Sequence, residues 1–139
     1  MISTLLLRVS VVLGLIGMTL GMVMGIRKDF TLAPAHAHLN LVGFVVPFLA
    51  GLYYRAVPRA GASVLARSHA WIAILGASVF PIGIVVVLLS GSAVLVASGG
   101  VIVLLGATLF AVIVFRTTRR PAVTTHSAAA AERTAVPPL

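Results

Sequence analysis

The chain has 139 residues, of which 60% are hydrophobic and 9% are charged, and its formal net charge is +8. This composition excludes an ordinary soluble domain, because a chain of this length would expose most of its apolar surface to water. The absence of cysteine excludes disulfides, thiolate metal sites and cysteine-ligated iron–sulfur clusters.

Four uncharged stretches are each about as long as a helix that crosses a bilayer. They predict helices at about 4–26, 32–54, 68–90 and 92–115. The last two stretches form one uncharged block that is too long for a single crossing, and a Ser-Gly-Ser cluster divides it. We therefore expect an all-α membrane protein, a four-transmembrane-helix bundle in one domain over residues 1–116. The small, polar and proline-containing residues 117–139 predict a disordered cytoplasmic tail.

The positive charges are distributed unevenly between the two ends of the predicted helices. One end has Arg27 and Lys28, next to Asp29. The other end has the remaining basic residues, which are Arg8, Arg55, Arg59, Arg67, Arg116, Arg119, Arg120 and Arg133. The positive-inside rule then places both termini in the cytoplasm. Anionic lipid head groups account for the positive charge, and nucleic acid is not expected as a partner.

The predicted second helix begins with the segment LAPAHAHLNLVGF, which carries His36 and His38 at membrane depth. Polar side chains at this depth are costly and mark functional sites. Two residues along a helix correspond to a rotation of about 200°, so the two imidazoles do not easily chelate one ion. They suit two separate partners, or one ligand and one structural group. The alternative is that both cap the helix end and face water.

The two sides of this helix differ in character. The side of His36 continues through small or polar residues that include Asn40 and Gly43. Such a surface lets another helix or a flat cofactor approach closely. The side of His38 is aliphatic and suits lipid or a porphyrin ring. The geometry of the helix alone does not choose between the two histidines.

Methionines of the first helix lie at the same depth as the two histidines, at Met18, Met22 and Met24. Imidazole together with thioether sulfur suits haem or soft copper, so Met22 is a candidate metal ligand. Methionine also fills irregular gaps in any apolar bundle, which is the alternative for all three residues.

The segment HLNLVGFVVPFLAGLYYRAVP, residues 38–58, resembles the second helix of the catalytic subunit of haem-copper oxidases and nitric oxide reductases. The shared features are the opening His-x-Asn-Leu, the small and aromatic residues, and a Tyr-Tyr pair before a proline. In that family the histidine is an axial ligand of a low-spin haem b near the outer face. The resemblance therefore implies that His38 binds haem iron and that Asn40 is its neighbour.

The rest of that family's active site has no counterpart in this chain. The catalytic subunits combine several four-helix arcs, and the chain corresponds to one arc, without the second axial ligand or the copper-site histidines. A complete oxygen- or nitric-oxide-reducing enzyme in one chain is therefore not expected. In a homo-oligomer, His38 or His36 of two copies would face each other across a two-fold axis and share the haem. Two imidazoles suit electron transfer, and a single imidazole leaves a position for a gas ligand.

His69 lies at the start of the predicted third helix, beside Trp71. The second helix carries the chain about 24 Å from His38 to Tyr54, so His69 lies near the opposite membrane face and does not share one haem with His38. An interfacial anchor is the first interpretation of His69. The alternatives are a second metal or cofactor site, or a site for a quinone head group together with Tyr53 and Tyr54.

The sequence thus predicts a multi-pass haem b protein of the bacterial inner membrane, acting in electron transfer or gas sensing. The predicted site residues are His38 and His36 as iron ligands, Asn40 and Gly43 beside the cofactor, and Met22 and His69 as further metal candidates. The expected partners are membrane lipid, a second copy of the chain, and a respiratory-chain protein or a quinone. The alternatives are a copper-handling protein and a cofactor-free assembly subunit of a respiratory oxidase.

Overall fold

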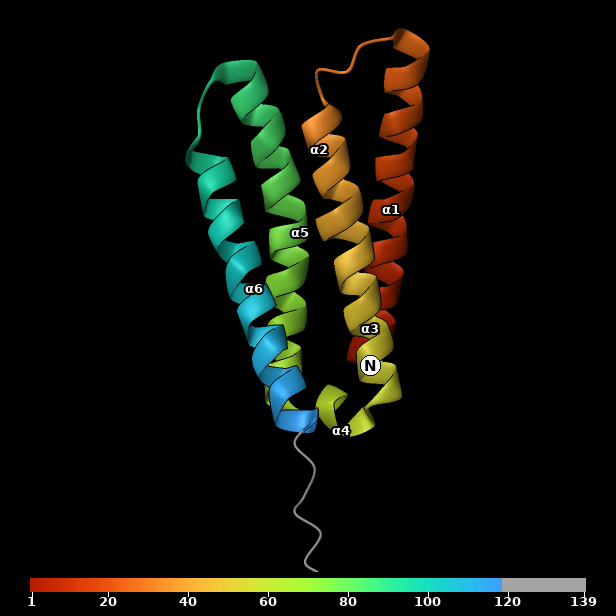
Figure 1. Cartoon of the computed structure of the whole chain (residues 1–139), viewed down its shortest axis with the longest axis vertical. Coiled ribbons are helices and arrows are strands. Elements are labelled where there is room, and N and C mark those ends of the chain that lie inside the picture. Colours follow the sequence, from red (N-terminus) through yellow and green to blue (C-terminus); the bar gives the residue numbers. More distant parts are fainter. Residues whose placement is uncertain (119–139) are drawn as a thin grey trace, which may run out of the picture.

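The computed structural model describes residues 1–118, and every element in this part of the chain is helical. The elements are α1 (Ile2–Arg27), α2 (Ala33–His38), the π-helical η1 (Leu39–Val45), α3 (Val46–Ala56), α4 (Pro58–Gly61), α5 (Val64–Ser90) and α6 (Val94–Thr118). The elements α2, η1 and α3 follow one another without a break and form a second span, Ala33–Ala56. This second span, α1, α5 and α6 are each long and apolar enough to cross a membrane (Figure 1). The predicted all-α fold with four candidate membrane-spanning helices is confirmed.

The long helices form two antiparallel hairpins (Figure 1). In the first hairpin α1 packs along the second span, and in the second α5 packs along α6, which is the most extensive contact of the bundle. Because α5 also contacts the second span, it joins the two hairpins, whereas α6 has little direct contact with the second span. The N-terminus, α4 and the end of α6 lie at the same end of the bundle.

Glycines let the two helices of the first hairpin approach closely. Gly21 of α1 faces His36, and a Cβ at this glycine would lie 2.5 Å from the ring atom Cε1. One turn away, Gly17 faces Asn40, and a Cβ there would lie 2.6 Å from Nδ2. Small residues at helix contacts are a common means of close approach in membranes. The first hairpin is therefore built around two of the polar side chains that the sequence singles out.

The third long helix starts earlier than predicted. Ser63 has an extended backbone, and its hydroxyl oxygen accepts a hydrogen bond of 3.1 Å from the N–H of Ala66, so it caps α5 from Val64 onward. The predicted start at residue 68 took Arg67 as the membrane boundary. The helix begins a turn before this point because a charged side chain in the first turn still reaches water and does not prevent the turn from forming.

In the second hairpin, α5 ends where the sequence predicts, and α6 extends a few residues beyond its predicted end. The helix α5 stops at Ser90, as predicted, because Gly91 adopts a φ of 74°, which is the left-handed conformation that favours glycine. The helix α6 runs to Thr118, whereas the sequence predicts its end at about 115. Here again an arginine close to the boundary lies inside the helix rather than ending it. The rest of the predicted tail, 119–139, lies outside the described residues.

The second span contains a π-helical segment close to a proline. Pro47 has no backbone N–H, so the carbonyl of Gly43, four residues earlier, lacks its α-helical donor. The π-helix lies directly upstream, over Leu39–Val45, and the N–H of Val46 donates to the carbonyl of Leu41, five residues earlier. The π-helical hydrogen bonds thus end at the residue directly before the proline. Short π-helical segments are rare and frequently lie at functional sites.

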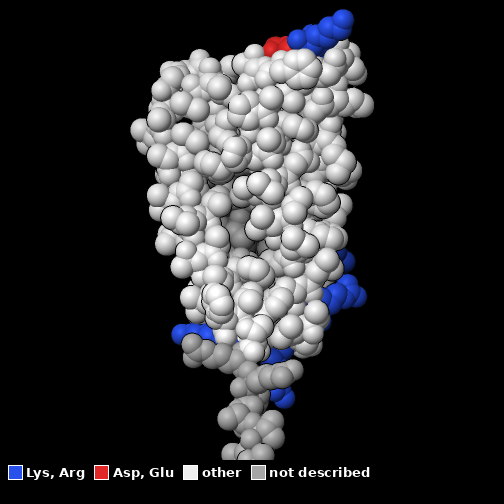
Figure 2. All heavy atoms as spheres, viewed as in Figure 1, with Lys and Arg blue, Asp and Glu red and all other residues white. Residues whose placement is uncertain are grey.

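The surface between the two ends of the bundle is apolar. Figure 2 shows that charged side chains lie toward the two ends, whereas the middle of this face carries none. Large apolar side chains such as Leu15, Leu49 and Leu104 are exposed along the helices. Exposed side chains of this kind suit contact with lipid, and four helices with such surfaces indicate a multi-pass membrane protein.

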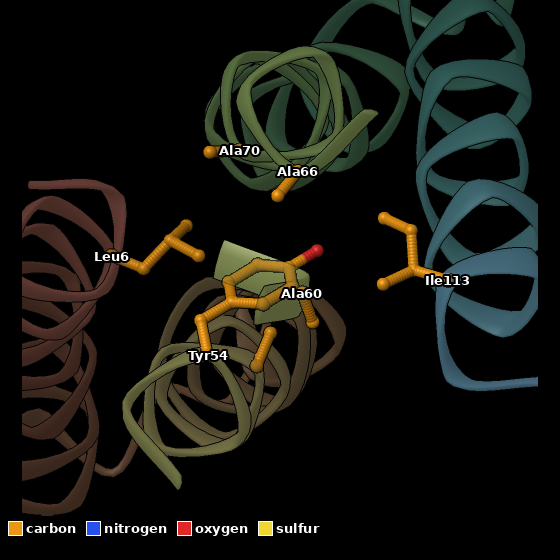
Figure 3. Close-up of a cluster of buried hydrophobic side chains, with 7 residues drawn as sticks. Leu6, Tyr54, Ala60, Ala66, Ala70 and Ile113 are labelled. Atoms are coloured by element: carbon orange, nitrogen blue, oxygen red, sulfur yellow. The ribbon is translucent and has the colours of Figure 1, made fainter. Parts of the chain in front are cut away.

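A cluster of buried side chains lies where all four long helices converge near α4 (Figure 3). Tyr54 of α3 lies among Leu6 of α1, Ala66 of α5 and Ile113 of α6 in this cluster. In Figure 3 its hydroxyl points away from α3, toward the space between α5 and α6. The core therefore fixes a phenol group between the two hairpins.

Candidate functional site

His36 lies in the contact between the second span and α1. Its Nδ1 is 2.9 Å from the backbone carbonyl oxygen of Gly17. A carbonyl oxygen accepts hydrogen bonds and does not donate them, so Nδ1 carries the proton and the neutral ring keeps its lone pair on Nε2. The ring also packs against Gly21. His36 therefore ties the two helices of the first hairpin together.

Asn40 lies one turn after His36 and supports the same part of the helix. Its Nδ2 donates to the backbone carbonyl of His36 at 2.9 Å. The same atom is 3.3 Å from Nδ1 of His36, but Nδ1 already donates to Gly17 and has no lone pair to offer. The structure thus places Asn40 against His36, in the contact with α1.

His38 points toward the other hairpin. Its Nδ1 donates to the backbone carbonyl of Pro34 at 2.8 Å. The ring meets Phe80 of α5 edge-on, with ring centroids 5.1 Å apart and an interplanar angle of 89°. The side chain is half-buried, and its Nε2 has no hydrogen-bond partner within the part of the chain that the structure describes. His38 therefore presents an imidazole of fixed orientation with an unpaired nitrogen.

The two imidazoles diverge, as their spacing predicts, because one contacts α1 and the other contacts α5. Among residues 1–118, no group of three or more His, Cys, Asp or Glu side chains is placed to hold a metal ion. Both rings donate from Nδ1 to a backbone carbonyl, which is the arrangement that orients a metal-binding imidazole through Nε2. The His36 ring packs with Cε1 closest to Gly21, and its Nε2 would lie 3.2 Å from a Cβ there, so Nε2 of His38 is the better placed for a ligand.

Two other predicted site residues lie apart from the free nitrogen of His38. Gly43 is buried against α1, where a Cβ would lie 3.4 Å from Cβ of Leu13, so protein side chains fill the space beside it. Met22 is exposed on α1, whereas the surface of α1 that receives His36 includes Gly21. The structure thus does not bring the thioether into the helix contact that holds an imidazole.

The structure brings together His69 and Tyr54, which are 2% and 3% exposed. The Tyr54 hydroxyl oxygen and Nδ1 of His69 are 2.9 Å apart. Phe110 of α6 stacks on the imidazole, with centroids 5.1 Å apart and an interplanar angle of 27°. His69 is therefore not an interfacial anchor, although Trp71, two residues later, is 63% exposed and suits that role.

A cavity of about 180 Å³ lies beside His69, between the second span, α5 and α6. Apolar residues form the rest of its lining, and they include Val42, Pro47, Val103 and Phe110. Figure 2 shows a hollow in this face of the molecule. The cavity lies where α6 has little direct contact with the second span, so it separates the two hairpins.

Sequence reasoning missed several residues that shape these sites. A usable signal was present in α1, because Gly14, Gly17 and Gly21 are three and four residues apart and so share one face. That spacing predicts the surface of α1 that receives the second span. Phe80 and Phe110 carry no comparable signal, since each lies in a helix that is apolar on all sides.

Comparison with protein-family models, with curated proteins and with solved structures gave no match to this chain.

Proposed function

We propose that this chain is a membrane haem b protein in which His38 supplies one axial ligand and a second copy supplies the other. One observation carries the proposal: His38, in the second candidate membrane span, commits Nδ1 to the carbonyl of Pro34 and leaves Nε2 unpaired among the described residues. Metal-binding histidines are oriented in this way by a backbone carbonyl or a carboxylate. The resemblance of residues 38–58 to the haem-binding helix of oxidases points to the same side chain.

The donor groups of the chain fit haem better than a free metal ion. Imidazole is a common axial ligand of haem iron, whereas a protein cage for an ion needs several ligands close together. Within residues 1–118 no such cluster exists. One imidazole per chain leaves one axial position, which His38 of a second copy fills across a two-fold axis. The second span exposes Leu41, Val45 and Leu49, which provide apolar surface for that contact.

The role that follows is electron transfer. Haem b held by two imidazoles exchanges one electron and has no open position for a gas ligand. The chain contributes the orientation of the ligand, because the bond to the Pro34 carbonyl fixes the tautomer of His38 and raises the basicity of Nε2. His36 contributes by tying the helix that carries His38 to α1.

The charges support an orientation for this protein in a bacterial inner membrane. The end with the N-terminus carries most of the basic residues, namely Arg8, Arg55, Arg59, Arg67 and Arg116 within the described part of the chain. The positive-inside rule places this end in the cytoplasm. His38 lies near the other end, so the haem is bound close to the outer face.

The test is to purify the protein in detergent and to measure haem content by the pyridine haemochrome assay. The matched variants are His38→Ala and His36→Ala, which remove the same side chain two residues apart. We expect His38→Ala to lose haem, and His36→Ala to keep haem per folded molecule while it unfolds more easily. Equal haem content in wild type and His38→Ala would overturn the ligand assignment.

Two further readings of the same samples separate the alternatives. A sharp α-band in the reduced protein, unchanged by carbon monoxide, supports two imidazole ligands, whereas a spectral change with carbon monoxide supports a gas-binding site with one ligand. A colourless protein that retains copper would favour the copper-handling alternative. The structure does not support that alternative, because the side chains of Met18 and Met22 are exposed on α1 rather than packed beside an imidazole.

A further inference from the structure

His69 has an unused nitrogen that opens into a cavity. Its one hydrogen bond joins Nδ1 to Tyr54, which leaves Nε2 without a partner among the described residues. In residues 1–118, every fully enclosed side-chain nitrogen or oxygen has a hydrogen-bond partner. Since Nε2 of His69 has none, this atom is not fully enclosed and must reach open space. His69 is 98% buried, and the space it borders is the apolar cavity beside α6.

The hydrogen bond to Tyr54 determines what Nε2 offers. Among residues 1–118 the hydroxyl of Tyr54 makes no other hydrogen bond, so its single proton is satisfied when it donates to Nδ1 of His69. A neutral imidazole that accepts at Nδ1 carries its proton on Nε2. His69 therefore directs an N–H donor into an apolar cavity, where a lone donor needs an acceptor.

The size of the cavity limits what the acceptor is part of. The volume is about 180 Å³, and an engineered protein cavity of about 150 Å³ accommodates benzene. A single substituted six-membered ring therefore fits, and a porphyrin does not. Phe110 lies in the lining and stacks on the imidazole, so a flat ring finds an aromatic neighbour. Val46, also in the lining, is 44% exposed, so the cavity borders the lipid-facing surface.

We propose that this cavity binds the head group of a lipid-soluble quinone, with one carbonyl oxygen accepting a hydrogen bond from Nε2 of His69. The ring fills the cavity near Phe110, and the isoprenoid tail extends past Val46 into the lipid. His69 lies about 16 Å along α5 from Phe80, which is the contact of His38 on that helix, so the hydrogen-bonding end of the cavity is separate from His38. The proposal therefore does not depend on haem binding.

The polar group distinguishes a quinone from a lipid acyl chain. An acyl chain would fill the apolar lining but would leave the N–H of His69 without an acceptor, which is costly in a dry site. A quinone carbonyl satisfies this donor and brings a ring of the right size. The second carbonyl of the quinone lies at the other end of the ring, so the two carbonyls have different surroundings.

The test uses the full chain in phosphatidylcholine nanodiscs and a decyl-benzoquinone labelled with carbon-13 at both ring carbonyls. Infrared spectroscopy follows the two carbonyl stretches as the quinone is titrated. We expect saturable binding in which one carbonyl shifts to lower wavenumber. His69→Phe should abolish the shift and weaken binding about tenfold or more, because the hydrogen bond is lost.

A matched pair of glycine substitutions in α6 provides the control for folding. Gly106 lines the cavity, and a Cβ there would lie 3.5 Å from Ile72, which is ordinary contact. Gly100 lies elsewhere on α6, and a Cβ there would lie 3.6 Å from the ring of Phe80. Gly106→Ala adds a methyl group to the cavity lining and should weaken binding about tenfold, whereas Gly100→Ala should bind as the wild type does.

Three results would overturn the proposal. The first is the absence of saturable binding in the wild type. The second is unchanged affinity and an unchanged carbonyl shift in His69→Phe, which would place the quinone elsewhere. The third is weaker binding in Gly106→Ala without any carbonyl shift in the wild type, which would indicate an apolar chain in the cavity. Each result is independent of whether His38 binds haem.

Discussion

Alanine at Gly99 should destabilise the second hairpin, whereas alanine at the neighbouring Gly100 should not. A Cβ at Gly99 would lie 2.7 Å from Cα and 2.8 Å from N of Phe80. These are backbone atoms of α5, so the clash is relieved by moving the helices apart and not by rotating a side chain. A Cβ at Gly100 would meet the ring of Phe80 at 3.6 Å, which is ordinary van der Waals contact.

The expected magnitude follows from two terms. Carbon atoms pack best at about 3.5–4.0 Å, so a Cβ at Gly99 requires the backbones to separate by about 1 Å. Overpacking of this kind costs about 1–3 kcal/mol. Alanine in place of glycine inside a helix gains about 1 kcal/mol at either position. Because both variants share this gain, the free energy of unfolding of Gly99→Ala should be about 1–3 kcal/mol below that of Gly100→Ala.

The assay is a titration of the purified variants with sodium dodecyl sulfate in dodecyl maltoside micelles, followed by circular dichroism. Comparing the two variants with each other removes the effect of helix propensity and leaves the contact between α5 and α6. If the two variants unfold at the same detergent fraction, the close approach at Gly99 does not limit the packing. The reasoning about the second hairpin would then be refuted.

Two further predictions concern the ends of the helices. Ser63→Ala removes the cap that accepts from the N–H of Ala66 and should lower the free energy of unfolding by about 1 kcal/mol in the same titration; Ser90→Ala, at a helix C-terminus, is the control and should have little effect. In the loop after α1, the Thr31 hydroxyl and the Thr31 backbone N–H both donate to Asp29 and hold the pKa of that carboxyl below its ordinary value, with the larger effect from the hydroxyl. Thr31→Ala should raise this pKa in a carboxyl carbon-13 titration, and an unchanged value would show that these hydrogen bonds do not form. Because the folded-state pKa lies below the unfolded-state pKa, the contribution of Asp29 to stability is complete above the unfolded-state value and is lost as the pH falls through the folded-state value.

The long helices could be predicted because the hydrophobic effect acts on composition alone. Uncharged stretches of sufficient length determine where the chain crosses a bilayer. The end of α5 could be predicted because Gly91 readily adopts the left-handed backbone that stops a helix. The start of α5 could not be read from charge, because Arg67 lies in the first turn, and the cap at Ser63 is the better signal. The π-helix could not be predicted either, since Pro47 shows which hydrogen bond is lost but not how the upstream turn rearranges.

The candidate site could be predicted only as far as local geometry extends. The rotation of 100° per residue correctly separates the directions of His36 and His38. It does not determine which helix each ring meets, because helices that are apolar on all sides carry no stripe that identifies the core-facing side. The rise per residue of a helix predicted that His69 and Tyr54 lie near the same end of the bundle. Their hydrogen bond could not be predicted, because it depends on how the two hairpins pack.

The packing of the bundle also predicts which substitutions affect stability and which affect ligand binding. Within each hairpin, glycines such as Gly17 and Gly99 bring helices so close that no ligand fits, so substitutions there act on stability. Between the hairpins, α6 has little contact with the second span, and the cavity beside His69 lies in that gap. A methyl group added at Gly106 meets ordinary contacts and keeps the hairpin intact. Loss of quinone affinity without loss of stability in that variant would therefore locate ligand binding between the hairpins, whereas parallel loss of both would show that the cavity is part of the packed core.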